Sequence, residues 1–244
     1  MYNILNWNTG LTEKTEEDES RFAIFEFVKS FLQDKFSIAV LQQIPYKTKK
    51  KIGGWKISKI YEDFISFFPE KEYQIFENKS YNNGFVIMMT VIVSQNEVVK
   101  PGDDSLYPNR IKTNREVAMT INGEFSLLGL HAKNGEANLS YLKSINSNAD
   151  IIVGDFNAGD YDECQNREAF KEILPDHVCI CNLPTKRVEN YDGELLRETC
   201  IDHIYVKRKL ITRCSNVVIH KENRLSDHYP ITFCIKSSKI EIIK

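Results

Sequence analysis

Residues 151–157 read Ile-Ile-Val-Gly-Asp-Phe-Asn, an apolar run that ends in a glycine and two polar side chains. Because β-branched residues favour extended backbone, the run predicts a buried strand over residues 150–154. Asp155 and Asn157 then follow the end of that strand. An aspartate after a strand is more often a turn former than a functional residue, so the segment alone predicts structure rather than chemistry.

Polar side chains also stand at the ends of other predicted strands. They are Asn8, Gln43, His131, Asp202, Asp227 and His228. Asp202 is the least ordinary of them, because a carboxylate between Ile201 and Ile204 is costly to bury unless it is paired. Groups on the ends of rigid strands converge on one rim more readily than groups on mobile loops. The pattern therefore predicts a polar site at one end of the fold.

Predicted strands outnumber predicted helices along the 244 residues. Asn122-Gly123, between strands at 116–121 and 124–131, is the strongest hairpin signal. Amphipathic helices are expected after an N-cap at Thr15, around 57–68, and at 137–147. The other expected strands are 2–7, 37–42, 85–93, 177–181, 200–206, 216–220 and 231–235. No repeat or flexible linker divides the sequence, so we expect one α/β (α+β) domain over residues 1–244, with packed mixed sheets and helices outside.

The composition is that of an ordinary globular protein, with 42% apolar and 27% charged residues. The N-terminus has no signal-peptide pattern, and the apolar stretch at 85–93 is too short to span a bilayer. We therefore expect a cytoplasmic protein with reduced cysteines. Cys179 and Cys181 raise the question of zinc, but no second Cys/His pair at ligand spacing accompanies them. Because alternation along a strand would put both on one face, we interpret them as core residues.

The formal net charge of −2 does not indicate a nucleic-acid-binding protein, so any contact with a polyanion must be local. The candidate surface combines four lysines with an aromatic side chain. It consists of Lys47, Lys49, Lys50, Lys51 and Trp55. The lysines would meet phosphates and the indole would stack on a base. A solvated loop explains the same residues equally well.

Five motifs in a fixed order resemble the endonuclease/exonuclease/phosphatase superfamily, which includes DNase I. They are Leu5-Asn6-Trp7-Asn8, Val40-Leu41-Gln42-Gln43, Gly154-Asp155-Phe156-Asn157, Ile201-Asp202-His203-Ile204 and Ser226-Asp227-His228-Tyr229-Pro230. The resemblance runs from residue 4 to about residue 235, and the last motif is the most specific. It implies a four-layered sandwich, in which two packed mixed β-sheets are flanked by helices, and a phosphodiester hydrolase.

The resemblance also implies a metal site. Asn8, Gln43 and Asp227 would hold Mg²⁺ or Mn²⁺, since hard cations prefer oxygen ligands. The superfamily has a glutamate where this chain has Gln43, so one negative charge is lost and metal affinity should fall. Two interpretations remain open: an enzyme with a weaker metal site, which we favour, and a member that binds without cutting.

The remaining site residues take catalytic roles by the same resemblance. Asp155 and Asn157 would orient the attacking water and the phosphate. Asp202 would hydrogen-bond one nitrogen of His228 and favour its charged form. His131 would contact the phosphate and protonate the leaving group. Whether Asp155 or His228 is the general base is left open.

Nucleic acid is the substrate class that we expect first, for a monomeric enzyme that does not contact membranes. The lysine cluster and the compact length favour it, whereas the mild acidity of the chain counts against tight non-specific binding. A small phosphodiester, nucleotide or phosphoinositide is the alternative. An exposed apolar hairpin of the kind that membrane-bound sphingomyelinases use is not evident in the sequence.

Overall fold

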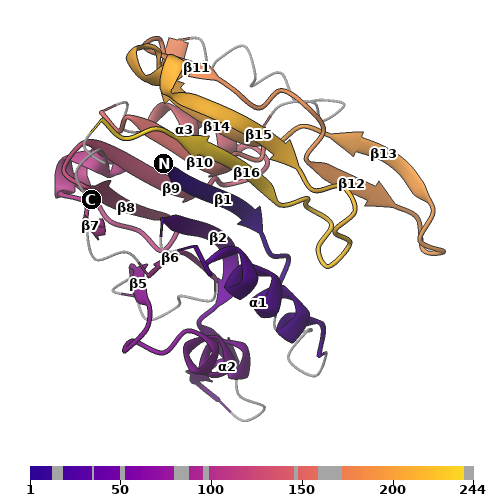
Figure 1. Ribbon diagram of the computed structural model, residues 1–244. Coiled ribbons are helices and arrows are strands. Elements are labelled where there is room, and N and C mark those ends of the chain that lie inside the picture. Colours follow the sequence, from indigo (N-terminus) through magenta and orange to yellow (C-terminus); the bar gives the residue numbers. More distant parts are fainter. Residues whose placement is uncertain are drawn as a thin grey trace.

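The computed structural model describes residues 1–12, 19–34, 36–49, 53–79, 88–95, 99–145, 148–158 and 172–238. Within these ranges, two six-stranded mixed sheets lie face to face (Figure 1). The first has the order β15 (Cys214–Ile219), β16 (Ile231–Ile235), β1 (Tyr2–Asn8), β2 (Ser37–Pro45), β6 (Met88–Ser94) and β5 (Gln74–Glu77). The second has the order β11 (His177–Cys179), β14 (Asp202–Lys207), β10 (Ile151–Asp155), β9 (Phe125–His131), β8 (Glu116–Ile121) and β7 (Val99–Pro101).

Helices cover the outer faces of both sheets. The leucine and tryptophan side chains of β1 pack with Phe25 of α1 (Ser20–Phe31) and Phe64 of α2 (Lys59–Phe67). Leu142 of α3 (Ala137–Lys143) packs against the second sheet. Within the described ranges, the short 3-10 helices are η3 (Asp104–Leu106), η4 (Pro108–Arg110) and η6 (Arg208–Arg213). None of the described helices has the length and apolar character to cross a membrane. These four layers confirm the predicted sandwich.

Strict alternation along the strands decides which side chains reach the space between the sheets. On β1, Ile4 faces the second sheet, whereas Leu5 and Trp7 face the helices. On β10, Val153 faces inward and Ile152 faces α3. Because side chains on a strand alternate with a period of two, the next inward positions are polar residues at the strand ends. The apolar core between the two sheets therefore ends, at the strand ends, in a cluster of polar side chains.

The predicted hairpin at Asn122-Gly123 is confirmed. Both residues have positive φ, 53° and 58°, which is the backbone of a type I′ turn joining β8 to β9. Two helix boundaries were predicted wrongly. The first helix begins at Ser20, several residues later than a cap at Thr15 implies, and residue 15 lies outside the described ranges. Ile57 belongs to a short strand and is exposed rather than helical, because Ser58 caps α2 and its hydroxyl accepts from the amide of Ile60.

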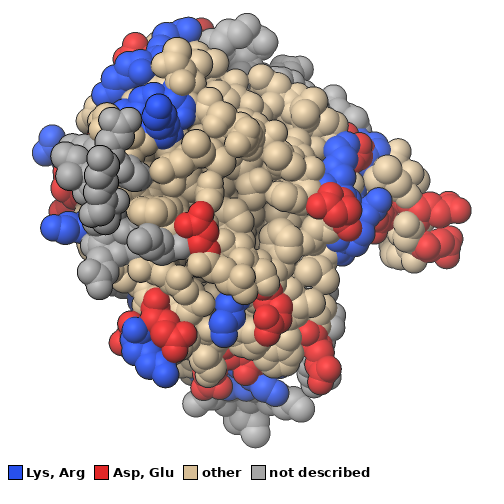
Figure 2. All heavy atoms as spheres, in the orientation of Figure 1, with Lys and Arg blue, Asp and Glu red and all other residues tan. Residues whose placement is uncertain are grey.

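A two-stranded hairpin, β12 (Lys186–Glu189) and β13 (Leu195–Thr199), projects from the sandwich (Figure 1). Tyr191 and Leu196 are exposed near its tip. Acidic side chains gather at the same tip (Figure 2). Sequence periodicity did not reveal this hairpin, since its strands pair with each other and bury little apolar surface.

Candidate active site

Asp155, at the carboxyl end of β10, is the centre of a buried polar cluster between the sheets. Strand register sets two of its neighbours: His131 on β9 and Asp202 on β14 are both directly paired with Asp155. All three continue the inward-facing positions of their strands, so they face the first sheet. The second sheet thus places two carboxylates and an imidazole side by side.

β1 of the first sheet supplies an amide, and the segment before β16 supplies a second imidazole. Asn8 Nδ2 donates to Asp155 Oδ2 over 2.8 Å, and His228 Nε2 lies 3.8 Å from the same oxygen. His131 Nε2 lies 3.6 Å from it. One carboxylate oxygen therefore faces three nitrogen atoms from three separate segments. The structure brings these predicted site residues together at one end of the sandwich, as the strand-end pattern required.

His228 and Asp202 form a buried ion pair. His228 Nδ1 lies 3.0 Å from Asp202 Oδ1 and 2.9 Å from Oδ2, which confirms the predicted contact. Thr185 Oγ1 also donates to Asp202 Oδ2, over 2.7 Å. Burial lowers the pKa of the imidazole, but the charge and hydrogen bond of Asp202, together with the charge of Asp155, outweigh burial and raise the pKa of His228.

The raised pKa predicts a pH-dependent contribution of His228 to stability. A histidine whose pKa is raised on folding stabilises the folded protein. This stabilisation is complete at pH values below the unfolded-state pKa of about 6.5, and it is lost as pH rises through the folded-state pKa. We expect the difference in unfolding free energy between wild type and His228→Asn to shrink as pH rises from about 5.5 to about 9. Urea unfolding without divalent metal, at several pH values, measures it. A difference that grows with pH would contradict the assignment.

His131 has the opposite tendency. Burial lowers its pKa, and the charge of Arg115 acts in the same direction, while Asp155 opposes both. Arg115 Nη1 donates to the backbone carbonyls of His131, over 3.0 Å, and Ala132, over 3.3 Å. Sequence reasoning missed this arginine, because it belongs to none of the motifs and reaches the site only through the pairing of β8 with β9.

In the Gly154-Asp155-Phe156-Asn157 segment, the backbone conformation explains why glycine and asparagine occupy the first and last positions. Asn157 has a φ of 47°, its amide donates to Asp155 Oδ1 over 2.8 Å, and its Nδ2 donates to the Ala132 carbonyl over 2.9 Å. Gly154 has a φ of 153°, and a Cβ atom there would lie 1.9 Å from the carbonyl oxygen of Leu130. The glycine and the asparagine thus hold the turn that fixes the Asp155 carboxylate.

Asp227 lies at the exposed edge of the cluster. Its Oδ2 is 3.0 Å from Lys186 Nζ, and its backbone carbonyl accepts from the amide of Arg187. Desolvation opposes ionisation, but the charges of His228 and Lys186 outweigh it and lower the pKa of Asp227. Lys186 was also missed, because it belongs to β12, which a single bridge to His228 holds against the site.

Gln43 lies at a bulge of β2 with a φ of 59°. Its backbone carbonyl accepts from the hydroxyl of Thr9 over 3.2 Å, so it lies beside the residue that follows Asn8. Gly10 closes the same region: a Cβ there would lie 3.5 Å from Asp227 Oδ1. The backbone thus gathers the three predicted metal ligands around the end of β1, and their role as ligands stays a prediction.

Solved structures provide the comparison. The endonuclease domain of TRAS1, a telomere-specific non-LTR retrotransposon, has a TM-score of 0.66 and 16% identity, over 98% of this chain and 100% of that chain. The 3′ phosphatase NExo from Neisseria, bound to product DNA hairpin, has a TM-score of 0.61 and 17% identity, over 97% and 100%. An AP endonuclease from Archaeoglobus fulgidus has a TM-score of 0.61 and 16% identity, over 97% and 100%. These are members of the endonuclease/exonuclease/phosphatase superfamily. The chain has the DNase I-like fold.

The predicted resemblance is thereby confirmed at the level of the DNase I-like fold. No protein-family profile matches the chain, and no curated protein is similar to it in sequence. The likeness is therefore structural, and the roles of the site residues stay predictions.

The lysine cluster falls partly outside the described part of this DNase I-like chain. Lys47 and Lys49 lie on β3 (Lys47–Lys49), which pairs with β4 (Trp55–Ile57) so that Lys49 is opposite Trp55. The Lys47 ammonium lies 5.5 Å from the centroid of the Tyr46 ring. Lys50 and Lys51 lie outside the described residues. A role in substrate binding stays a prediction.

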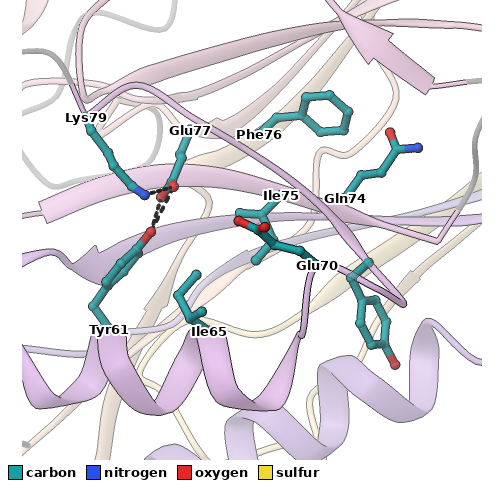
Figure 3. Close-up of a pocket in the computed structure, with 9 residues that line it drawn as sticks. Tyr61, Ile65, Glu70, Gln74, Ile75, Phe76, Glu77 and Lys79 are labelled. Carbon is teal, nitrogen blue, oxygen red and sulfur yellow. Dashed lines mark hydrogen bonds and ion pairs between the residues drawn. The ribbon is translucent and has the colours of Figure 1, made fainter.

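A separate pocket of about 490 Å³ opens between α2 and β5 (Figure 3). Three of its polar side chains are paired with one another, since Glu77 accepts from the hydroxyl of Tyr61 and forms an ion pair with Lys79. None of the residues that line it belongs to the cluster around Asp155. The candidate active site of this DNase I-like fold is therefore the strand-end cluster and not this pocket.

Proposed function

We propose that this protein is a divalent-metal-dependent phosphodiester hydrolase that acts on nucleic acid. The observation that supports it best is the arrangement around Asp155: one carboxylate oxygen facing Asn8, His131 and His228, with Asp202 behind His228. Attack of water on a phosphodiester builds charge on the phosphoryl and leaving oxygens, and fixed charged or hydrogen-bonding groups stabilise that charge.

The histidines would divide the proton chemistry. Asp202 accepts from His228 Nδ1, so Nε2 is the nitrogen that faces Asp155 and the phosphate. Because its pKa is raised, His228 keeps its proton to a higher pH than an ordinary histidine, and the charged ring would stabilise the negative charge that develops on the phosphate. The pKa of His131 is lowered, so this ring loses its proton at a lower pH than His228 does. Asp155 and Asn157 would orient the water. Asp155 would be the general base while His228 is protonated, and His228 could take that role only after losing its proton at higher pH.

The predicted ligands suit a hard divalent cation, and together they carry one negative charge fewer than a set with glutamate at position 43. Asn8 Nδ2 donates to Asp155, which leaves Oδ1 as the atom that would bind the metal; this oxygen also accepts a hydrogen bond from the amide of Gly10. Gln43 and Asp227 would add one amide and one carboxylate oxygen, with Lys186 neutralising part of that carboxylate. Bound Mg²⁺ or Mn²⁺ would polarise a phosphoryl oxygen and stabilise charge on the leaving oxygen.

Nucleic acid is the substrate class with the most support. Several structural neighbours are nucleases, and one is bound to a product DNA hairpin. Lys47 and Lys49 offer local positive charge, whereas the acidic tip of the β12–β13 hairpin would repel phosphates. A small phosphodiester is the second candidate substrate, because the charged side chains of the site lie within a few ångströms of one another and could surround a single phosphate group.

A substrate panel tests the proposal. Purified protein would be incubated with plasmid, single-stranded DNA, RNA, a phosphoinositide and a generic small phosphodiester, each with Mg²⁺, Mn²⁺ or EDTA. Asp155→Asn, prepared in parallel, controls for contaminating nucleases. We expect metal-dependent turnover of a nucleic acid by wild type only. Equal turnover by wild type and variant on every substrate would contradict the proposal and favour a non-catalytic binding protein.

Gln43→Glu is expected to tighten metal binding. At about 4 Å and an effective dielectric near 20, one added charge facing a divalent ion is worth several kcal/mol before desolvation, which offsets much of it. We expect tighter Mg²⁺ binding by calorimetry and half-maximal activity at a lower metal concentration. Gln33→Glu, the same change at an exposed position, is the control. Identical affinities of wild type and Gln43→Glu would show that residue 43 is not at the metal.

A further inference from the structure

A second cluster of metal-ligating side chains lies on the opposite face of β14 from Asp202. His203 faces outward, packing with Phe156 and Tyr205. Its Nδ1 lies 3.9 Å from the sulfur of Cys179 and 4.0 Å from the sulfur of Cys200. The fold thus brings together residues from β11, from the end of β13 and from β14. The Cys200-x-x-His203 pair is the second Cys/His pair at ligand spacing that sequence analysis overlooked.

The tautomer of His203 leaves Nδ1 as the donor atom. Its Nε2 lies 2.7 Å from the carbonyl oxygen of Ala158. Because a carbonyl oxygen only accepts hydrogen bonds, Nε2 carries the proton and Nδ1 presents its lone pair to the two thiols. Imidazole ligands of metals are commonly held in this way, with the second ring nitrogen donating to a backbone carbonyl.

Cys181 is not part of this cluster, which corrects the expectation that it shares a face with Cys179. β11 ends at Cys179, and Cys181 then turns into the apolar layer between the sheets. Cys179 packs instead with the outer layer next to α3. Alternation failed as a guide because the strand ends between the two cysteines.

The geometry points to a Zn²⁺ site formed by Cys179, Cys200 and His203. In a tetrahedral site, Zn–S bonds of about 2.3 Å and Zn–N bonds of about 2.0 Å put sulfur and nitrogen about 3.6 Å apart. The two sulfur–nitrogen separations exceed this by only a few tenths of an ångström. The two sulfurs lie more than 4.8 Å apart, so rotation of one cysteine side chain toward the other would close the site. Cys179 is partly exposed and would leave the fourth position to water.

Charge balance suits the buried location. Each thiol loses its proton to solvent when the metal binds, so two protons are released for each Zn²⁺. Two thiolates, one neutral imidazole and Zn²⁺ sum to zero charge, which limits the cost of burial. Binding would replace the present hydrogen bond from the Cys179 thiol to the carbonyl of Cys181. The ion would tie β11 to the start of β14, the strand that carries Asp202.

Cobalt spectroscopy tests the site independently of hydrolysis. Metal-free, reduced wild-type protein would be titrated with Co²⁺ alone. We expect thiolate-to-cobalt charge-transfer absorption and tetrahedral visible bands that saturate at one ion per chain and disappear when Zn²⁺ is added. An ion held by the oxygen ligands around Asp227 would give no thiolate band, so the two sites are distinguishable.

Cys179→Ser and Cys200→Ser are expected to abolish the thiolate absorption, whereas Cys214→Ser and Cys234→Ser are matched controls that keep it. Circular dichroism establishes that each variant is folded, and Cys179→Ala serves if the serine variant is not. A Zn²⁺-dependent rise in Tm should accompany the band in wild type and be lost with it. Absence of the band in wild type, or its survival in both Cys179 and Cys200 variants, would overturn the proposal without affecting the proposed hydrolase function.

Discussion

Replacing His228 by alanine is expected to lower kcat by about 10²–10⁴-fold, because the change removes a positioned proton carrier and a charge that stabilises the transition state. Asp155→Ala should cost a similar factor, since its carboxylate is the centre on which Asn8, His131 and His228 converge. Initial rates at saturating metal and substrate measure both effects. Circular dichroism and urea unfolding establish that each variant is folded. Near-normal turnover in either folded variant would contradict the site.

Coupling between Asp202 and His228 provides the internal control for this prediction. Asp202 touches His228 Nδ1 and would act on the phosphate only through that ring. Asp202→Asn should therefore lower kcat in the wild-type protein but change kcat little when His228 is already alanine. A double-mutant cycle measures this difference, which arises because Asp202 acts through the His228 ring. Additive losses would show that Asp202 has a separate role.

Gly154→Ala is expected to destabilise the fold by more than about 4 kcal/mol or to prevent folding, the range reserved for severe steric mechanisms. The added Cβ would meet the backbone carbonyl of Leu130 on the neighbouring strand, at 1.9 Å, so no side-chain rotation relieves the clash. Denaturant unfolding and soluble yield measure the effect. Gly193→Ala is the control, because its φ of 79° is also positive but no atom lies within 4 Å of the added Cβ.

Gly193→Ala should lower the free energy of unfolding by only about 1 kcal/mol, the ordinary cost of a positive φ in a residue with a side chain. Equal stability of the Gly154 and Gly193 variants would show that β9 and β10 move apart easily. In that case the position of Asp155 would not depend on the close approach of the two strands.

Local patterns in the sequence predicted the layers and most of the cluster, because period-two alternation and turn chemistry are local properties. The inward positions of β1 and β10 follow from alternation alone, and so do Asn8 and Asp155 at their ends. The pairing of Asp202 with His228 was predicted from the resemblance and not from spacing.

Contacts that depend on long-range register were not predictable. Lys186 reaches Asp227 only because β12 bridges His228, and Arg115 reaches His131 only through strand pairing. The third failure was the placing of Cys179 and Cys181 on one face, where the strand ended sooner than alternation assumed. In each case a tertiary contact or an early strand end overrode the local pattern.

The position of β1 between β2 and β16 has a consequence for how the chain is made. β1 leaves the ribosome long before β16, the strand that completes the sheet beside it. Trp7 Nε1 donates a hydrogen bond to the backbone carbonyl of His228 across 221 residues. Contacts over such separations close large loops and slow folding. Until residue 235 has emerged, one edge of β1 has no partner and the cluster lacks His228. A nascent chain that stalls before that point would expose apolar strand surface, which favours aggregation.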